Sequence, residues 1–309
     1  MDKPFLKWAG GKAKITARIN RNLHKLKQQS NATQLIEPFL GSGAVFLNAN
    51  SVGFSQYLLC EINEDLIDLY QTLQLDTNGS FIDECESLFT EKNREQEEYI
   101  KRRKEFNDVK KELQNTSLKP EEKGQKKRTK SALFIYLNRH CFNGLCRYNN
   151  KGEFNVPFGQ FKKIYFPRKE MENFHKKSKD TKKVIFKCMD FEEVLTYAVQ
   201  DTTTKSVVYA DPPYVPLEAQ TSNFSKYAKG GFPVQKHEQL ATMIKELAKK
   251  GTPVLLSNHH TDFTKELYEG ENVSFETFEV RRSISSDGEN RNKVEEMLVS
   301  FSVSAPIKK

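Results

Sequence analysis

The segment Val207–Pro216 ends an apolar run with an acid, two prolines and a tyrosine, at residues 211–214. Proline lacks the N–H group that a central strand needs, so the chain must leave the sheet at Asp211. Such a turn holds a carboxylate and an aromatic ring in fixed positions. A rigid surface turn would have the same residues, so these four alone do not indicate a reaction.

One reaction needs both groups, namely attack by the exocyclic amine of a nucleobase, whose lone pair is conjugated with the ring. Asp211 and the main-chain carbonyl of Pro212 can accept the two N–H bonds of the amine and make its nitrogen more pyramidal. Pro213 stiffens the turn, and Tyr214 offers a face on which the base can stack. A neutral amine needs no strong base, so we expect Asp211 to orient and polarise it.

A glycine pair at Gly41 and Gly43 follows another apolar run and lets the backbone approach a ligand closely. The third glycine of the nicotinamide fingerprint is absent, because Phe46 stands at its position. Glu61, eighteen residues after Gly43, ends the next predicted strand. A carboxylate there can accept hydrogen bonds from both hydroxyls of a ribose, which indicates a nucleoside-containing ligand.

A third predicted strand end carries Asp190 followed by Phe191. The carboxylate can accept a hydrogen bond from the amine of an adenine while the ring packs on the base. Asp190 can equally cap the helix that follows it, and both interpretations stay open. If the first holds, three strand ends surround one adenosine at the carboxyl edge of the sheet.

Strands alternate with helices at both ends of the chain, which predicts an α/β fold: a Rossmann-like mixed sheet with helices on both faces. The expected helices are Ile15–Leu26, Asp65–Leu75 and Val234–Lys249. The expected strands are Gln34–Glu37, Gln56–Cys60, Val184–Cys188, Ser206–Ala210 and Pro253–Ser257, followed by a hairpin of Ser274–Val280 and Val294–Phe301.

Residues 76–179 interrupt this rhythm and are predicted to be a mostly helical insertion, so that 1–75 and 180–309 form the core. A charged helical stretch covers 82–109. Residues 114–130 are polar and predict a mobile basic loop. A β-hairpin is expected over 147–158, turning at the Asn-Asn-Lys-Gly sequence of 149–152.

The net charge of +8 lies mostly in one place, because residues 101–130 contain twelve Lys or Arg against five Asp or Glu. Such a run indicates a solvated face or attraction to phosphate groups. No apolar run approaches the roughly 18–20 residues of a membrane span, and no signal-peptide core follows the N-terminus. Five cysteines in no regular framework favour free thiols, so we expect a cytoplasmic protein. The cysteine spacing lacks a Cys-x-x-Cys pair, so no metal site is expected.

The sequence resembles the Dam-type DNA adenine-N6 methyltransferases, which use S-adenosylmethionine and typically modify adenine in GATC. Residues 5–12 (FLKWAGGK) resemble the N-terminal motif of that family, 37–43 (EPFLGSG) its cofactor loop and 211–214 (DPPY) its catalytic motif. Residues 138–148 and 152–161 are similar to the DNA-reading segment, and 281–286 to the last core hairpin. The resemblance covers nearly the whole chain.

This resemblance implies that S-adenosylmethionine is the cofactor, and it implies a role for each matching residue. Trp8 and Lys12 would line the methionine end of the cofactor, while Phe39, Gly41 and Gly43 would form its floor. Glu61 would hold the ribose, Asp190 with Phe191 the adenine, and Asp211 would lie beside both cofactor and target. The catalytic residues would be Asp211, Pro212, Pro213 and Tyr214.

The resemblance also implies the DNA contacts. Arg147 would read a guanine through its bidentate fork. Phe142 would insert into the base stack and ease flipping of the target adenine. Lys7 would contact a base or phosphate near the target. The further candidates in the same reading surface are Asn143, Leu145, Pro157 and Phe161. Residues 215–217 and 223–227 resemble the loop over the target base.

The expected function is therefore site-specific methylation of adenine N6 in double-stranded DNA, within GATC and with base flipping. The alternatives are methylation of cytosine N4 or of RNA, and a catalytically silent DNA-binding relative. Cytosine-N4 enzymes more often carry Ser where Asp211 stands. A monomer without an obligate protein partner is expected, of prokaryotic or phage type, in a restriction-modification or Dam pathway.

Overall fold

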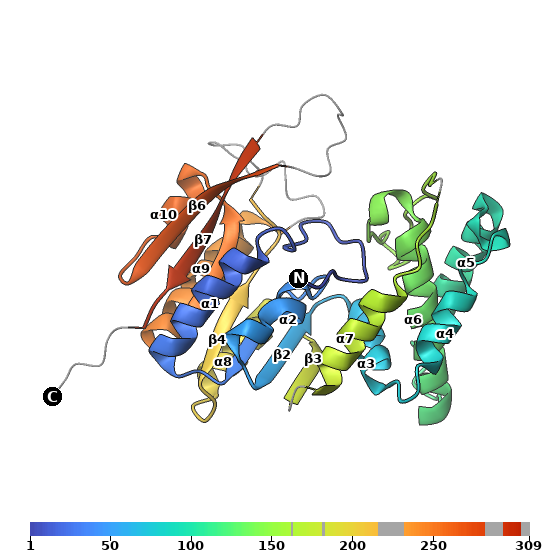
Figure 1. Ribbon diagram of the computed structural model, residues 1–309, viewed down its shortest axis with the longest axis horizontal. Helices are drawn as coiled ribbons and strands as arrows, with labels where there is room; N and C mark the ends of the chain where they lie inside the picture. The colour runs from blue at the N-terminus through green and yellow to red at the C-terminus, as the bar shows by residue number, and fades with distance from the viewer. Residues whose placement is uncertain (162, 181–182, 216–231, 282–292, 304–309) are drawn as a thin grey trace. The chain divides into compact units, whose positions relative to one another are not determined.

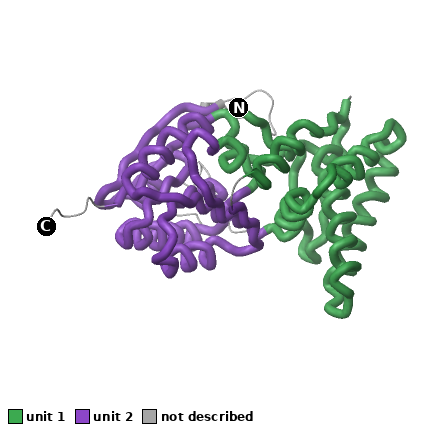
Figure 2. The backbone as a smooth tube through the Cα atoms, turned by 60° about the horizontal axis from the view of Figure 1, so that its bottom comes forward, with its two compact units in different colours: residues 1–14, 41–48, 63–182 green, residues 15–40, 49–62, 183–309 purple. Residues whose placement is uncertain are grey.

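The computed structural model describes residues 1–161, 163–180, 183–215, 232–281 and 293–303. The chain forms two compact units, coloured separately in Figure 2. Unit 1 contains residues 1–14, 41–48 and 63–182, and unit 2 contains residues 15–40, 49–62 and 183–309. Of the segments expected near the target base and in the last hairpin, residues 216–217, 223–227 and 282–286 lie outside the described residues.

Among the described residues, the strands of unit 2 form one seven-stranded sheet in the order β3-β2-β1-β4-β5-β7-β6 (Figure 1). The first five strands in this order are parallel, and β7 is antiparallel to both β5 and β6. The strands are β1 (Gln34–Glu37), β2 (Gln56–Glu61), β3 (Lys183–Cys188), β4 (Ser206–Ala210), β5 (Val254–His259), β6 (Val273–Arg281) and β7 (Lys293–Phe301).

The central strands of unit 2 are buried on both faces, which explains why β1 and β4 have no polar alternation. On one face Ile36, Val208 and Leu256 pack in a core with the apolar sides of α8 and α9. On the other face lies α1, which is drawn in front of the sheet in Figure 1. The helices of unit 2 are α1 (Thr16–Ser30), η1 (Ala49–Val52), α8 (Phe191–Gln200), α9 (Val234–Lys249) and α10 (Asp262–Tyr268).

Unit 1 is helical and is built around α6. Residues 130–138 of α6 are buried on all sides, because α3, α4 and α5 each pack against this helix. The helices of unit 1 are α2 (Ala44–Asn48), α3 (Glu64–Leu75), α4 (Ser80–Ser87), η2 (Lys92–Arg94), α5 (Gln96–Glu112), α6 (Pro120–His140), η3 (Phe142–Gly144) and α7 (Arg168–Asp180).

The predicted mobile basic loop at residues 114–130 is wrong for residues 120–130, which form the first half of α6. Pro120 stands at the start of the helix, where its missing N–H group costs no hydrogen bond. Glu121 and Glu122 follow in the first turn, where negative charge is favourable. Residues that look like a polar turn therefore begin a helix.

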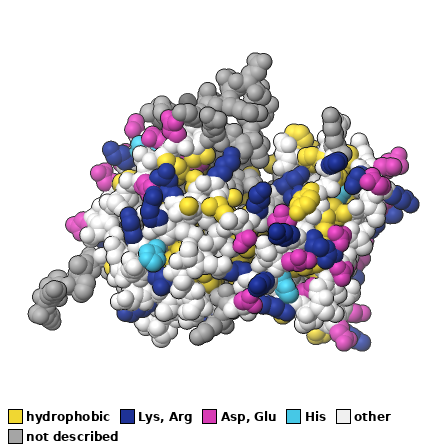
Figure 3. Space-filling view, viewed as in Figure 1, with side chains coloured by type: hydrophobic (Ala, Val, Ile, Leu, Met, Phe, Trp, Pro, Cys, Tyr) yellow, Lys and Arg dark blue, Asp and Glu magenta, His cyan; other side chains and the backbone are white. Residues whose placement is uncertain are grey.

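Acidic partners neutralise much of the basic stretch. Lys126 lies 2.6 Å from Glu112 of α5, and Arg128 lies 2.6 Å from Glu84 of α4. On the face drawn in Figure 3, Lys and Arg side chains are interspersed with Asp and Glu side chains. The basic stretch thus joins helices of unit 1 to one another, which is a structural use of its charge.

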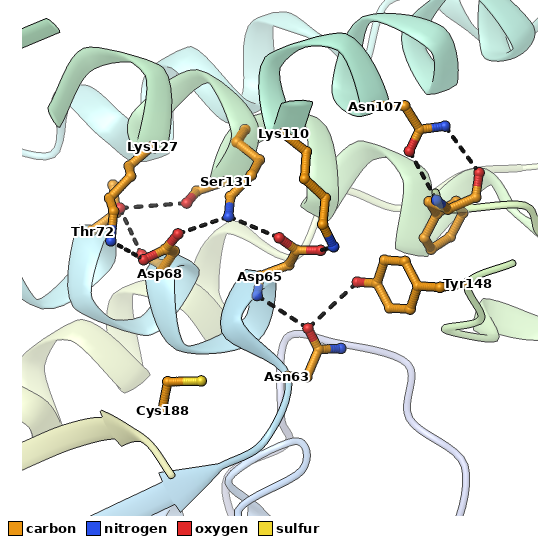
Figure 4. Close-up of polar contacts among 12 residues, drawn as sticks. Asn63, Asp65, Asp68, Thr72, Asn107, Lys110, Lys127, Ser131, Tyr148 and Cys188 are labelled. Atoms are coloured by element: carbon orange, nitrogen blue, oxygen red, sulfur yellow. Dashed lines mark hydrogen bonds and ion pairs between the residues drawn. The ribbon is translucent and has the colours of Figure 1, made fainter. Parts of the chain in front are cut away.

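A buried ion cluster joins α3 to α5 and α6 (Figure 4). The ammonium group of Lys130 donates to Asp65 Oδ1 and to Asp68 Oδ2, both at 2.7 Å. Lys110 donates to the other oxygen of Asp65 at 2.6 Å, and Lys127 donates to Asp68. Burial acts to raise the pKa of Asp65, but the charges of Lys130 and Lys110 hold this pKa below its ordinary value.

The other expected elements match the structure to within a few residues. The stretch 82–109 divides into the end of α4, η2 and most of α5. The expected hairpin at 147–158 turns back as predicted, and the isolated bridge of Tyr148 with Phe154 lies within it, while a second isolated bridge joins Phe158 to Cys141 outside it. The division into units differs from the predicted one, because 1–14, 41–48 and 63–75 join the insertion in unit 1.

Candidate active site and DNA interface

The carboxyl edge of the parallel strands in unit 2 brings three predicted acids into one row. β2 ends at Glu61, β3 is followed by Asp190, and β4 is followed by Asp211. These strands and β1 run in the same direction, so their carboxyl ends meet at one edge. The strand order reverses between β1 and β4, and ligands of open α/β sheets bind at such a point.

The backbone holds Glu61 at this edge. The N–H group of Ile62 donates to Glu61 Oε1 at 3.1 Å, and the N–H group of Met189 donates to the carbonyl of Glu61 at 3.3 Å. The side chain is half-buried. A carboxylate anchored in this way suits the paired hydroxyls of a ribose.

Asp190 is the N-cap of α8. Its Oδ1 accepts a hydrogen bond from the N–H group of Glu193 at 2.9 Å, and the Glu193 side chain accepts one from the N–H group of Asp190 at 3.0 Å. The capping interpretation of Asp190 is therefore confirmed. A contact of Asp190 with an adenine amine stays a prediction.

Three phenylalanine rings gather beside Asp190. Phe39 and Phe191 stack with ring centroids 5.6 Å apart and planes at 24°. Phe232 packs against both, with centroids 5.9 Å from Phe39 and 5.4 Å from Phe191. A base inserted between two rings needs a separation of about 7 Å, twice a van der Waals contact. In this arrangement, an adenine could therefore lie only against an outer surface of the cluster.

Asp211, in the turn after β4, is held by a hydrogen bond from the neighbouring strand β5. The hydroxyl of Ser257 donates to Asp211 Oδ1 at 2.7 Å. At the other end of the turn, the N–H group of Val215 donates to Asn258 Oδ1 at 3.2 Å. Pro212 is buried and Pro213 is exposed. The carboxylate predicted to meet the target amine is thus held by a neighbouring strand.

Tyr214 lies between two residues of the neighbouring strands. Its ring meets the His259 ring edge-on with centroids 4.8 Å apart, and its hydroxyl donates to Glu296 Oε2 at 3.4 Å. Burial, followed by the charge of Asp211, raises the pKa of Tyr214 well above its ordinary value. The phenol therefore stays protonated.

The N-terminal and glycine-loop residues of unit 1 form a second group. Gly41 has φ +49°, and a Cβ atom there would lie 2.9 Å from Trp8 Nε1, so the indole packs directly on the glycine. The hydroxyl of Tyr70 donates to the Gly41 carbonyl at 2.7 Å. Gly43 also has a positive φ, of 70°. Lys12 is 7% exposed, and its ammonium group donates to the Gly10 carbonyl at 2.7 Å.

Lys7 is tied to the expected DNA-reading segment by its backbone. Its N–H group donates to Asn138 Oδ1 at 2.9 Å, and Asn138 Nδ2 donates to the Lys7 carbonyl at 2.8 Å. The Lys7 ammonium group lies 3.8 Å from the centroid of the Phe161 ring. Burial, and then the charge of Arg139, lowers the pKa of Lys7. Two predicted DNA contacts, Lys7 and Phe161, are thereby brought together.

The remaining DNA candidates lie on η3 and the hairpin that follows. Phe142 is 50% exposed, and its N–H group donates to the Pro157 carbonyl at 2.9 Å. Asn143 has φ +53° and is exposed, and Leu145 is half-buried. Phe142 therefore has the exposure that an inserting side chain needs.

Arg147 is exposed at the base of the hairpin. Its Nε donates to Asn155 Oδ1 at 2.9 Å, and its Nη2 donates to the Asn155 carbonyl at 3.3 Å. These two bonds hold the guanidinium group in one orientation. Asn155 was not predicted from the sequence, although it lies in the segment that resembles the DNA-reading motif.

Comparison with known families decides the membership of the chain. The model of the D12 class N6 adenine-specific DNA methyltransferases matches residues 8–284. The chain belongs to this family. The match spans both units and includes the turn after β4, so this D12 class methyltransferase has the expected Rossmann-like core.

Full-length relatives of this methyltransferase carry the name DNA adenine methylase. The one from Haemophilus influenzae is 41% identical over 301 residues, which are 97% of this chain and 93% of the relative. The one from Vibrio cholerae is 40% identical over 300 residues, 97% of this chain and 96% of the relative. The one from Escherichia coli K12 is 39% identical over 310 residues, 100% of this chain and 99% of the relative.

Sequence reasoning missed two residues of the methyltransferase that contact the turn after β4, Ser257 and Asn258. Both are fully buried at the carboxyl end of β5. The signal was present, because polar residues end an otherwise apolar strand there, as Asp211 does after β4. Their hydrogen-bond partners lie across the sheet, which a linear pattern does not specify.

Further features of the described residues concern metals and membranes. Within the described ranges, no three His, Cys, Asp or Glu side chains gather as ligands for one metal ion. The five cysteines, all among the described residues, are thiols that form no disulfide. None of the helices that the structure describes is both long and apolar enough to cross a membrane.

Proposed function

We propose that this D12 class methyltransferase transfers the methyl group of S-adenosylmethionine to N6 of adenine within GATC in duplex DNA. The observation that carries this proposal is the turn of residues 211–214, which holds a carboxylate and a neutral tyrosine ring at the carboxyl end of β4. The relatives named DNA adenine methylase support the choice of adenine.

The residues present fit S-adenosylmethionine as methyl donor. Glu61 offers a carboxylate to the ribose hydroxyls, and the cluster of Phe39 and Phe191 offers an apolar surface to the adenine. In unit 1, Gly41 allows close backbone approach, and Lys12 offers a buried ammonium group to a carboxylate. S-adenosylmethionine supplies an electrophilic methyl group when bound.

The protein's own contribution to the reaction is to bind and orient the target amine. Asp211 Oδ and the Pro212 carbonyl would accept its two N–H bonds, which directs the nitrogen lone pair away from the protein acceptors and towards the methyl group. Tyr214 would stack on the extruded base, since base-modifying enzymes take their target out of the helix. Asp211 orients the amine in this proposal, and no strong base is required.

The DNA contacts are proposed for unit 1, which contains Lys7, Phe142, Asn143, Leu145, Arg147, Pro157 and Phe161. Arg147, pre-oriented by Asn155, would read a guanine, and Phe142 would fill the space left by the flipped adenine. Residues 76–179 would accordingly serve as the target-recognition domain. We propose that the protein acts as a monomer on its DNA.

The test is incorporation of labelled methyl groups from S-adenosylmethionine into two duplexes that differ only in a GATC site, followed by nucleoside analysis. We expect label in N6-methyladenine of the GATC duplex alone. Equal labelling of both duplexes would refute the GATC assignment, and label in cytosine would refute the choice of adenine. With an RNA substrate assayed in parallel, label in RNA but not in DNA would indicate an RNA methyltransferase. No label in any substrate would indicate a catalytically silent DNA-binding protein.

The role of Asp211 is tested with Asp211→Ala. We expect this variant to lose methyl transfer and to keep its affinity for S-adenosylmethionine, measured by calorimetry. A variant that still transfers methyl groups at the wild-type rate would contradict the assignment.

A further inference from the structure

Residues at the carboxyl end of β5 form hydrogen bonds with both ends of the turn of residues 211–215. Ser257 donates to Asp211 at 2.7 Å, and Asn258 accepts from the N–H group of Val215 at 3.2 Å. The ring Nδ1 of His259 lies 2.7 Å from the Val215 carbonyl. Three successive residues of one strand thus fix a turn that two prolines already stiffen.

A hydrogen-bond chain with a defined direction leads into Asp211. The Ser257 hydroxyl has one hydrogen, and a carboxylate can only accept, so this hydrogen is used for Asp211. The Tyr209 hydroxyl lies 3.1 Å from Ser257 Oγ and must therefore be the donor in that contact. The chain runs from Tyr209 through Ser257 to Asp211.

Both upstream groups are buried within the sheet. Ser257 is fully buried and Tyr209 is 1% exposed, since each lies within a strand of the sheet. Burial, and then the charge of Asp211, raises the pKa of Tyr209 well above its ordinary value, so the phenol keeps the proton that it donates. A donor chain anchored in the sheet cannot adjust to a rotated carboxylate without losing a bond.

We propose that Ser257, supported by Tyr209, is a positioning residue that sets the orientation of the Asp211 carboxylate towards the adenine amine. This inference rests on the proposed role of Asp211. Because Ser257 occupies Oδ1, the plane of the carboxylate is fixed before the base arrives. Preorganisation of this kind acts on the rate of the chemical step more than on binding.

The experiment measures the single-turnover rate of methyl transfer together with the dissociation constants for S-adenosylmethionine and for a GATC duplex. For Ser257→Ala we expect a rate between about ten-fold and a hundred-fold below wild type, as for small errors of position, with both dissociation constants within about three-fold. A wild-type rate would overturn the proposal. Equal losses in rate and in DNA affinity would also overturn it, because they would indicate a general structural role.

The matched control is Ser206→Ala. Ser206 is a buried serine of the same sheet whose hydroxyl donates to Gln34 at 2.8 Å, at the opposite end of β4. The same atom is removed from a similar environment, so the control variant should keep the wild-type rate. A loss in the control as large as that of Ser257→Ala would overturn the proposal.

Tyr209→Phe provides the second, independent variant. It removes the donor behind Ser257 without touching Asp211, so we expect a smaller loss of rate than for Ser257→Ala. The double variant should be no slower than Ser257→Ala alone, because without the Ser257 hydroxyl the Tyr209 hydroxyl no longer has a hydrogen-bonded link to Asp211. If Ser257→Ala does not fold, an unchanged rate in Tyr209→Phe overturns the proposal and a reduced rate with intact binding supports it.

Failure of the positioning role of Ser257 can be distinguished from failure of the proposed function. If Asp211→Ala retains activity, the assignment of Asp211 itself is wrong. If Asp211→Ala is inactive while Ser257→Ala and Tyr209→Phe are both fully active, the catalytic assignment stands and the positioning role is refuted.

Discussion

Replacing Lys130 with methionine should destabilise unit 1 strongly, because it breaks the ion cluster of α3 and α6. Lys130 is 2% exposed, and its two partners, Asp65 and Asp68, are 0% and 2% exposed. Methionine has a similar length and no charge. The substitution therefore removes two hydrogen bonds and one charge while it nearly preserves the volume.

The expected decrease in the free energy of unfolding depends on which ion pairs remain after the substitution. Removing one member of a buried ion pair costs about 3–5 kcal/mol, because the other charge stays buried. Lys110 and Lys127 still pair with one oxygen of each carboxylate after the substitution. We therefore expect a decrease in the free energy of unfolding in the lower part of this range, about 3–4 kcal/mol.

The assay is urea denaturation of the full-length protein at pH 7, followed by tryptophan fluorescence. Trp8 is the single tryptophan of the chain and lies in unit 1, so the signal reports on the unit that contains the cluster. The control is Lys126→Met on the same helix. Its side chain is 32% exposed and pairs with a Glu112 that is 54% exposed, so it should cost less than about 1 kcal/mol.

The pH dependence gives an independent check. The pKa of Asp65 is lowered in the folded protein, so its contribution is present above the unfolded value of about 3.9 and is lost as the pH falls through the lower folded value. The pKa of Lys130 is raised, so its contribution is present below the unfolded value of about 10.4 and is lost at higher pH. The difference between wild type and Lys130→Met should thus be largest at intermediate pH.

A result that would refute this reasoning is a Lys130→Met variant no less stable than Lys126→Met. Equal stability would mean that Lys110 and Lys127 suffice to compensate both buried carboxylates. A constant difference from pH 3 to pH 11 would show that lost packing, and not charge, causes the destabilisation.

Three shorter predictions concern function. Gly41→Ala places a Cβ atom 2.9 Å from Trp8 Nε1 at a φ of +49°, so calorimetry should show about ten-fold weaker binding of S-adenosylmethionine. The control Gly53→Ala has a similar φ of +77° but no atom within 4 Å of the new Cβ, so it should bind S-adenosylmethionine normally. Arg147→Ala should reduce discrimination at one guanine by about 1–3 kcal/mol in rate assays on variant sites, and an unchanged site profile would contradict the assignment. Phe142→Ala removes a half-exposed ring, so it should leave stability nearly unchanged but reduce the fluorescence rise of 2-aminopurine placed at the target adenine.

The sequence predicted best those helices and strands for which the hydrophobic pattern and the local conformational propensity indicate the same secondary structure. The ranges of β1, β4 and α9 match their predictions to the residue, because apolar runs of strand length and an amphipathic helix can form little else. The wrong element was the start of α6. Its lysines and Gly124 resemble a turn. Pro120, Glu121 and Glu122 suit a helix start, but the acids of α3, α4 and α5 that pair with its basic side chains are distant in the sequence.

In the candidate site too, the sequence predicted some residues and missed others. The sequence placed Asp211, Glu61 and Phe191 at strand ends, and the structure confirms these positions, while their roles stay predictions. Ser257 and Asn258 also end an apolar strand with polar groups, but serine and asparagine satisfy many backbone positions, so their types did not identify their partners. Their partners became visible only when β5 was placed beside β4.

The position of β1 in the sheet has a consequence for synthesis of the protein on the ribosome. β1 pairs with β4, and the hydroxyl of Ser206 reaches Gln34 across 172 positions of the chain. At about 5–20 residues per second, the ribosome needs on the order of ten to thirty seconds to produce that partner. Until then one edge of the buried strand β1 has no partner strand, whereas all residues of unit 1 precede the last four strands. Nascent chains stalled before β4 should therefore depend on chaperones more than chains stalled after it.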